Sequence, residues 1–529
     1  MPENHGFEES QEIHELGLKN KKDLPPNTAE ADAAHQDGKI YSFDEAITLA
    51  KVGSFHYFLQ FTCGMCLMTA TVEVMGMSII MPFITHDIPS TSSEKGLLAS
   101  AGFLGIVLSS HAVGFLSDTW GRARMLRTTL SISFLTSFAS VFSYNIWMLI
   151  VFRFLTGFIM SGCQGSVFNY LGEFHSSKTR AKYVTMLSVF AQLGMIFMPA
   201  VALVILPLKL DITILGLQFQ SWRLLLLVFS CMRTFALIGL FTLPESPKFV
   251  FVQGDHEKAL ETLRMIYSKN TKNPQYEYPV HQIAPDGRGD NLKNVCGVKD
   301  AVALIWTQTT PLFNKSRVLH TVNICLIMFL MSAVSHGSYM WFPTILKQQI
   351  ANIGSGLTTC EIMHLVSNDS AVNMSQLEDV SSEVVIDTTM FKILITIGTV
   401  FSVTFFLFAL IINTVGKRKF LFGLILIPGL SALVLHFITN IPWAIVILTI
   451  VMTLSNGVGI VGTMAFEFFP TNVSGMGMSL VMMMARVGSA AGSSIFGSMI
   501  NNSCDKLFYI SFASCMLLLV LSILLPGKR

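Results

Sequence analysis

The chain has 529 residues, of which 52% are hydrophobic and only 13% are charged. Since an average soluble domain carries about 25% charged residues, this chain cannot cover itself with a polar surface. The composition excludes a soluble enzyme, a nucleic-acid-binding protein and a disordered protein. The formal net charge of +2 predicts no bulk electrostatic partner.

Long apolar segments follow a polar N-terminal region, residues 1–54, which lacks the short apolar run of a cleavable signal peptide. A helix needs about 20 apolar residues to cross a bilayer. About twelve stretches fit: 55–84, 96–117, 126–144, 147–171, 182–207, 222–243, 319–345, 389–413, 419–438, 441–466, 475–499 and 506–526. The pattern predicts an all-α membrane protein with twelve transmembrane helices.

The spans fall into two groups of six, residues 55–245 and 319–529, separated by a polar linker, residues 246–318. In the linker, Asp255 can cap a helix. Four apolar residues would share one face of that helix: Leu260, Leu263, Ile266 and Tyr267. This stripe favours one or more cytoplasmic helices over a solvated connection.

Basic residues in the connections predict the orientation. They gather in the even-numbered connections and at the C-terminus, in residues such as Arg122, Arg180 and Lys417. Both termini are therefore expected in the cytoplasm. The loop 346–388 falls on the luminal or extracellular side and carries two N-glycosylation sequons, at Asn368 and Asn373. The expected location is the plasma membrane or a vesicle membrane.

The two groups of spans resemble an internal repeat. Asp118-Thr-Trp-Gly121-Arg122 follows the second span, and Asn413-Thr-Val-Gly416-Lys417 follows the eighth, 295 positions later. Glu173-Phe174 and Glu467-Phe468 end the fourth and tenth spans, 294 positions apart. The second copy is weaker because Asn413 replaces the aspartate.

The segment GFLSDTWGRAR, residues 114–124, lies on a tight cytoplasmic turn. Gly121 permits the turn, and Asp118 can pair with a neighbouring helix end or with an arginine. A buried pair is costly to split, so such pairs can hold an inner gate closed. The alternative is ordinary anchoring by basic loops, but that rule requires no Asp or Gly spacing.

The segment 114–124 resembles the signature of the major facilitator superfamily. Glu173 with Arg180, and PESPK at residues 244–248, are similar to its sugar-porter and organic-ion branches. The segments 41–47, 53–57 and 219–223 are similar to the synaptic vesicle glycoprotein 2 family. The resemblance assigns gating to residues at the cytoplasmic helix ends: Asp118, Gly121, Arg122, Arg124, Glu173, Arg180, Glu245, Lys417, Arg418 and Glu467.

The resemblance implies two six-helix bundles around a central cavity lined by spans 1, 4, 7 and 10, with alternating access by rocking of the bundles. Charged residues within spans include Glu73 and Arg486, and each costs about 2.5–3.5 kcal/mol on insertion scales. Glu73, in span 1, either carries a proton or forms a fixed ion pair. Arg486, in span 11, either contacts an anionic solute or bridges the halves, and it can pair with Glu73.

Arg153 resembles an arginine typical of the superfamily's fourth span, although its side chain can also snorkel outward. Neutral polar residues in cavity-type spans suggest a site for a polar organic molecule, although each alone is more often a contact between helices. They are Gln164, Gln192, His336, Tyr339 and Asn456.

The expected function is secondary transport of a small polar organic solute, an organic ion or a sugar-like molecule, with possible coupling to protons. The alternative is a non-transporting receptor or vesicle component that keeps the fold. We expect no enzymatic activity and no cofactor, because the sequence has no P-loop or hydrolase motif. We expect no metal site, because the cysteines lack metal-binding spacing, and no nucleic-acid partner, because of the composition. We expect a monomer in the lipid bilayer.

Overall fold

The structure is a computed structural model. It describes residues 40–84, 87–208, 210, 212–214, 216–284, 310–314, 318–365, 388–468, 474–501 and 503–525. Both sequons, at Asn368 and Asn373, lie outside these residues.

The first half forms a bundle of six long helices. They are α4 (Ser54–Ile84), α5 (Ser92–Trp120), α6 (Arg122–Ser140), α7 (Ile146–Gly172), α8 (Ser177–Ile205) and α9 (Ser221–Thr242). Within this bundle α5 and α6 pack on α7, and α4 packs on α8 and α9. A short antiparallel hairpin, β2 (Thr213–Ile214) and β3 (Leu217–Gln218), connects α8 to α9.

The second half repeats this arrangement. Its helices are α13 (Val318–Ala351), α15 (Thr388–Val415), α16 (Lys417–Val434), α17 (Ile441–Met452), α18 (Gly457–Phe468), α19 (Ser474–Met499) and α20 (Cys504–Ile523). A 3₁₀ turn, η4 (Leu435–Phe437), extends α16, and another, η5 (Thr453–Asn456), joins α17 to α18. The span expected over 441–466 is therefore one crossing with a break in its middle.

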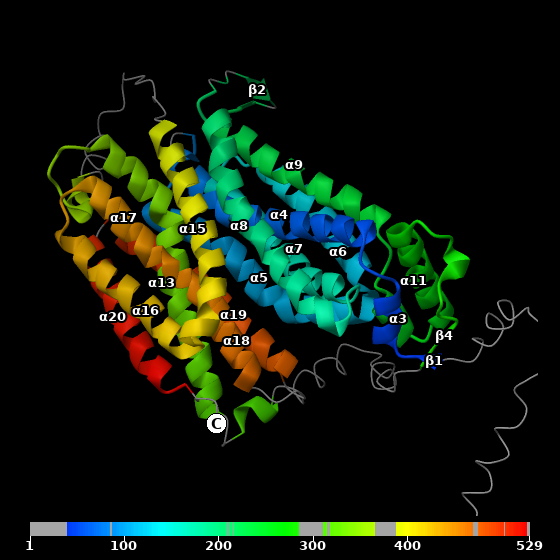
Figure 1. The fold of residues 1–529 in the computed structure, drawn as a ribbon. Helices are drawn as coiled ribbons and strands as arrows, with labels where there is room; N and C mark the ends of the chain where they lie inside the picture. Colours follow the sequence, from blue (N-terminus) through cyan, green and yellow to red (C-terminus); the bar gives the residue numbers. More distant parts are fainter. Residues whose placement is uncertain are drawn as a thin grey trace, which may run out of the picture.

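Figure 1 shows the two bundles side by side, with the first inclined beside the second. They meet where α5 contacts α19, where α8 contacts α15 and where α4 contacts α13. By length and composition, ten helical segments of the described chain can cross a membrane. The other two expected spans correspond to α5 and α6. Buried serine and threonine side chains lower the hydropathy of α6, since they pack between helices and do not face lipid.

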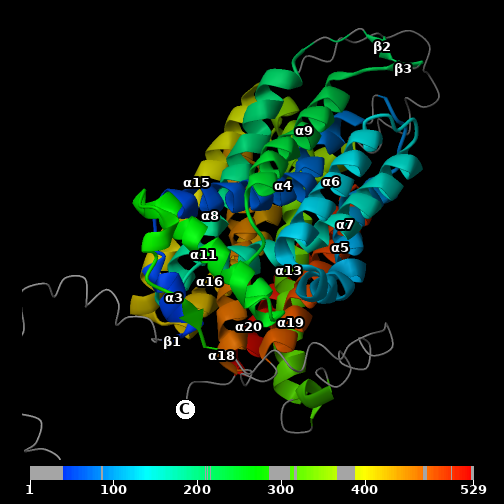
Figure 2. The same ribbon diagram turned by 90° about the vertical axis from the view of Figure 1, so that its right-hand side faces the viewer.

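A small polar subdomain covers one end of the first bundle. It contains β1 (Ile40–Tyr41), α3 (Phe43–Leu49), α10 (Pro247–Val252), α11 (His256–Thr271), η1 (Gln275–Glu277) and β4 (Gln282–Ile283). A separate 3₁₀ turn, η3 (Thr310–Phe313), precedes α13. We call the membrane face that carries this subdomain the linker side, and the face that carries the β2–β3 hairpin the far side. Figure 2 shows the subdomain and the hairpin at opposite ends of the molecule.

The linker helix has the form that the sequence predicts. The Asp255 side chain accepts a hydrogen bond from the Lys258 backbone N–H at 3.2 Å, which caps α11. Leu260, Leu263 and Ile266 are buried on one face. From residue 40 onward, the N-terminal segment packs against the linker. The strand β1 pairs in parallel with β4, and the Tyr278 hydroxyl donates a hydrogen bond to the Ala46 carbonyl at 2.6 Å.

Candidate functional site

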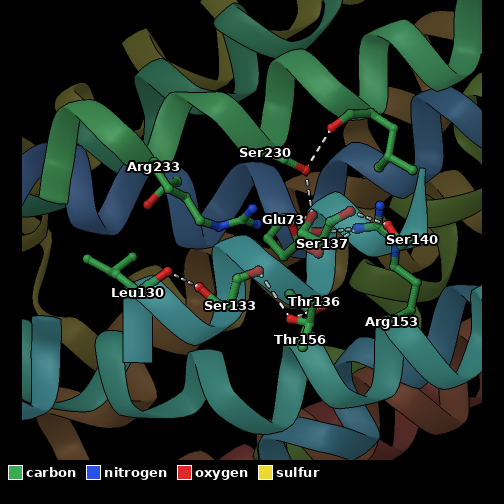
Figure 3. A network of polar contacts seen from close by, with 12 residues as sticks. Glu73, Leu130, Ser133, Thr136, Ser137, Ser140, Arg153, Thr156, Ser230 and Arg233 are labelled. Carbon is green, nitrogen blue, oxygen red and sulfur yellow. Dashed lines mark hydrogen bonds and ion pairs between the residues drawn. The ribbon is translucent and has the colours of Figure 1, made fainter. Parts of the chain in front are cut away.

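Glu73 of α4 lies between two arginines inside the first bundle (Figure 3). Its Oε1 accepts a hydrogen bond from Arg153 Nη1 of α7 at 2.6 Å, and its Oε2 pairs with Arg233 Nη2 of α9. The side chains of Glu73, Arg153 and Arg233 are only 4%, 5% and 0% exposed. We call these three residues the charged triad.

Two serines extend the charged triad to a fourth helix. The Ser137 hydroxyl of α6 donates to Glu73 Oε2 at 3.2 Å, and it lies 2.7 Å from the Ser230 hydroxyl of α9. The network therefore ties α4, α6, α7 and α9 together through one carboxylate. Ion pairs and hydrogen bonds offset the cost of keeping these charges within the membrane-spanning part of the chain.

The pair between Glu73 and Arg486 that the sequence suggested is not formed. Glu73 is taken by Arg153 and Arg233, whereas Arg486 Nη1 of α19 contacts Gln164 Oε1 of α7. The Arg486 contact connects the two bundles, which fits the bridging alternative. Arg153 does not snorkel to the surface, because its partner lies inside the bundle. The depth of a residue along its helix does not determine which neighbouring helix its side chain faces.

A cavity lies between the bundles, with lining residues from both halves of the chain. Four of the neutral polar residues expected at a central site line it: Gln192, His336, Tyr339 and Asn456. The cavity is bordered by α4, α8, α13, α15, α17 and η5. Spans 1, 7 and 10 therefore line it as expected, but spans 5 and 8 take the place of span 4. Consequently Arg153 and Gln164, both on α7, do not line this cavity.

The cavity combines uncharged polar groups with apolar walls. No described lining residue is Asp, Glu, Lys or Arg. The Tyr339 hydroxyl donates to Met195 Sδ at 3.0 Å, and Phe103 packs edge-on to the His336 ring, with centroids 5.8 Å apart. Asn456 lies in the 3₁₀ break, and its buried Nδ2 has no acceptor among the described residues. This amide is free to donate to a bound molecule.

Three contacts join the bundles on the far side. Asn501 Nδ2 donates to Ser92 Oγ at 2.7 Å, and Lys347 Nζ donates to the Pro82 carbonyl at 3.2 Å. Phe83 and Phe391 stack with ring centroids 6.1 Å apart. These contacts join α4 and α5 of the first bundle to the second half near the outer ends of their helices.

On the linker side, the turn between α5 and α6 is held by two acidic residues. Gly121 has φ +111°, a conformation that favours glycine. Glu245 accepts hydrogen bonds from the backbone N–H groups of Ala123 at 2.8 Å and Arg124 at 3.2 Å, and so caps α6. Arg122 Nε pairs with Glu173 at 3.2 Å.

The predicted gating residues are thus partly brought together. Arg180 lies against Gly172 at the end of α7, beside Glu173. The side chains of Asp118 and Glu467 lie outside the described part of the structure. In these positions the linker-side network joins the start of α6 to the end of α7 and to Glu245, which follows α9, all within the first half of the chain.

The internal repeat is visible at the equivalent turn of the second half. Gly416 precedes α16 with φ +88°, as Gly121 precedes α6. Arg127 of α6 donates to the Leu240 carbonyl at the end of α9 at 3.0 Å. Arg418 of α16 donates to the Ile523 carbonyl at the end of α20 at 2.9 Å. In each half, an arginine of the third helix caps the C-terminus of the sixth.

The sequence model of the Major Facilitator Superfamily matches residues 62–367, more than half of the chain. The chain belongs to the Major Facilitator Superfamily. This is a family of multi-pass membrane transporters and not of enzymes, and the two-bundle fold is the one expected from the sequence.

Individual relatives and solved structures agree with this membership. The chain is 28% identical over 312 residues to synaptic vesicle glycoprotein 2C of Homo sapiens, covering 56% of this chain and 43% of that protein. It is 27% identical over 350 residues to synaptic vesicle glycoprotein 2A of Pongo abelii, covering 63% and 47%. The matches thus span less than half the length of these relatives.

Solved transporters have the same fold at low identity. The xylose transporter XylE from E. coli, in a partially occluded inward open conformation, superposes with a TM-score of 0.63 and 14% identity, covering 90% of this chain and 100% of that one. A mutant of the nucleoside transporter NupG superposes with a TM-score of 0.58 and 10% identity, covering 89% and 100%.

Within this superfamily member, the main residue that sequence reasoning missed is Arg233. It lies in the middle of the span 222–243 and carries the same insertion cost as Glu73. Its position as a charged residue inside a predicted span is the sequence signal that indicates it.

Proposed function

We propose that the protein is a secondary transporter that moves a small polar organic solute across a membrane by alternating access. The observation that carries this proposal is the cavity between the bundles, lined by Gln192, His336, Tyr339 and Asn456. Both halves contribute to its walls, so a rocking motion of one bundle against the other would open it to one side and then to the other.

The chemistry of the cavity supports a solute with both polar and apolar surfaces. The amides of Gln192 and Asn456 and the Tyr339 hydroxyl offer hydrogen bonds, while Met75, Phe401 and their neighbours offer apolar contact. Sugar-like molecules and organic ions both remain candidates. Arg486 is our candidate for contact with an anionic solute; it lies on α19, contacts Gln164 of α7 and does not line this cavity in the structure.

We further propose that Glu73 couples transport to protons. Both guanidinium groups pair with its carboxylate while the charged triad is intact. A shift of α4 against α7 or α9 would separate the carboxylate from these partners, and uptake of a proton would remove the uncompensated negative charge. The alternative is that Glu73 only fixes the packing of the bundle.

We place the linker side and both termini in the cytoplasm of a monomer in the plasma or a vesicle membrane. Arg122, Arg124 and Lys417 lie on the linker side, as the positive-inside rule requires of cytoplasmic loops. Cys360 and Cys504 form a disulfide near the far-side ends of α13 and α20. Disulfides persist in oxidising compartments, so this bond supports an extracellular or luminal far side.

The test is uptake by the purified full chain in liposomes. Radiolabelled sugars, nucleosides, organic cations and organic anions are supplied with and without an inward proton gradient. We expect saturable uptake of at least one class, driven by the gradient in the wild type but no longer in Glu73→Gln. An Asn456→Ala variant should raise the KM for that solute.

Absence of uptake for every class would favour the alternative of a non-transporting receptor or vesicle component, which the replacement of Asp by Asn413 in the second half also favours. Gradient-driven uptake that persists unchanged in Glu73→Gln would remove the proton role and leave the transport function in place.

A further inference from the structure

The charged triad carries a net positive charge. Glu73 supplies one negative charge, and Arg153 and Arg233 supply one positive charge each. Among the described residues, no second Asp or Glu forms an ion pair with either guanidinium. An unpaired charge is strongly disfavoured away from water. The surroundings of Arg153 and Arg233 are therefore suited to one further negative charge.

Both arginines also retain hydrogen-bond donors that no described residue accepts. These donors are Nε and Nη2 of Arg153 and Nε and Nη1 of Arg233. The two side chains are 5% and 0% exposed, so bulk water does not reach these groups freely. Buried guanidinium N–H groups normally have partners. These N–H groups are therefore available to an acceptor from outside the network, such as a bound ion.

A small cavity adjoins Arg153. It is lined by Glu73 and Arg153, by Gly102 of α5 and Gly157 of α7, and by apolar side chains of α4 and α5. A Cβ placed on Gly102 would meet no atom within 4 Å, so there is room in front of this glycine. This small cavity shares no lining residue with the cavity between the bundles.

We propose that the small cavity binds a monovalent inorganic anion of the chloride type, which accepts hydrogen bonds from Arg153 and neutralises the charged triad. One negative charge balances the excess of one positive charge, whereas a divalent anion would leave a net negative charge. The carbon-lined remainder of the cavity suits a weakly hydrated monovalent ion. The anion holds the first bundle together and is separate from the transported solute, so this inference does not rest on the proposed function.

The experiment measures the thermal unfolding of the detergent-purified full chain while sodium chloride replaces sodium gluconate at constant ionic strength. We expect a saturable rise of the unfolding temperature, because a ligand of the folded state stabilises it. Sodium sulfate at the same ionic strength should not reproduce this saturable rise. Equilibrium binding of ³⁶Cl⁻ to the same sample should approach one chloride per chain.

Two variants locate the ion. Arg233→Gln leaves the Glu73–Arg153 pair but removes the excess charge, so the chloride effect should vanish. Gly102→Ala adds a methyl group to a residue that lines the small cavity, with no protein atom within 4 Å of it, and should raise the half-maximal chloride concentration at least tenfold. Gly423→Ala is the matched control, since a Cβ there also meets nothing within 4 Å, and it lies on α16 of the other bundle.

The inference is overturned if no ³⁶Cl⁻ binds, or if sulfate stabilises the protein as chloride does, which would be a general salt effect. It is also overturned if Gly102→Ala and Gly423→Ala respond to chloride alike. If Arg233→Gln fails to fold, ³⁶Cl⁻ binding to the wild type and to Gly102→Ala still decides the outcome.

Discussion

Replacing Glu73 by Gln tests how strongly the charged triad holds the first bundle. The amide keeps the size of the side chain and one hydrogen-bond acceptor, but it removes the negative charge between Arg153 and Arg233. Removing one partner of a buried ion pair costs about 3–5 kcal/mol, because the remaining charge is left uncompensated. Since the oxygen of the introduced amide can still accept one hydrogen bond, we expect the lower end, about 3 kcal/mol.

The assay is equilibrium unfolding by SDS in mixed detergent micelles, followed by circular dichroism. Glu94→Gln is the control, because Glu94 lies in an exposed capping box with Thr91 where Gln can take its place. We expect the free energy of unfolding to change by less than about 0.5 kcal/mol there. Adding Arg233→Gln to Glu73→Gln should cost much less than the sum of the single losses, since the two residues interact. A Glu73→Gln variant as stable as the wild type would refute this reasoning.

Three more predictions concern other parts of the molecule. Gly121→Ala should lower the free energy of unfolding by about 1–3 kcal/mol, because φ is +111° and the new Cβ would lie 2.7 Å from a Glu245 oxygen. Gly416→Ala is the control: its φ is +88°, but a Cβ there meets open space, so the loss in the same SDS titration should be smaller. Equal losses in the two variants would contradict this prediction. Cys360→Ser should lower the free energy of unfolding by about 2–4 kcal/mol. Because Cys504 is buried, its freed thiol is labelled after denaturation without reductant, and a mutant with no more labelled thiols than the wild type would show that the bond does not form in the protein. Arg486→Ala should fold normally and weaken binding of anionic metabolites in a thermal-shift screen, and unchanged binding would remove that role.

The membrane spans and the repeat could be predicted from the sequence because both depend on local patterns. About 20 apolar residues suffice to indicate a membrane helix, and the glycine turns at Gly121 and Gly416 keep a fixed spacing. The cap of α11 by Asp255 and its buried face also follow from neighbours along one helix. These features need no knowledge of how helices pack against one another.

The pairing of charges could not be predicted in this way. Whether Glu73 meets Arg486 or Arg153 depends on the rotation of α4 against its neighbours, which depth along a helix does not specify. The apolar pattern of 441–466 gave no sign that Thr453–Asn456 would form a 3₁₀ turn, although such breaks within membrane helices often mark functional places. The pairing of β1 with β4 joins residues too far apart for any local pattern.

The most direct test of alternating access uses Ser455→Cys, because Ser455 lines the cavity between the bundles. A membrane-impermeant thiol reagent is added to sealed vesicles in which either the linker side or the far side faces outward, with the wild type as the control for native cysteines. The transporter proposal predicts that the introduced thiol reacts from both sides. We expect the faster reaction from the linker side, because the contacts Asn501–Ser92, Lys347–Pro82 and Phe83–Phe391 join the bundles on the far side. A thiol that reacts from one side only, under all conditions, would contradict it.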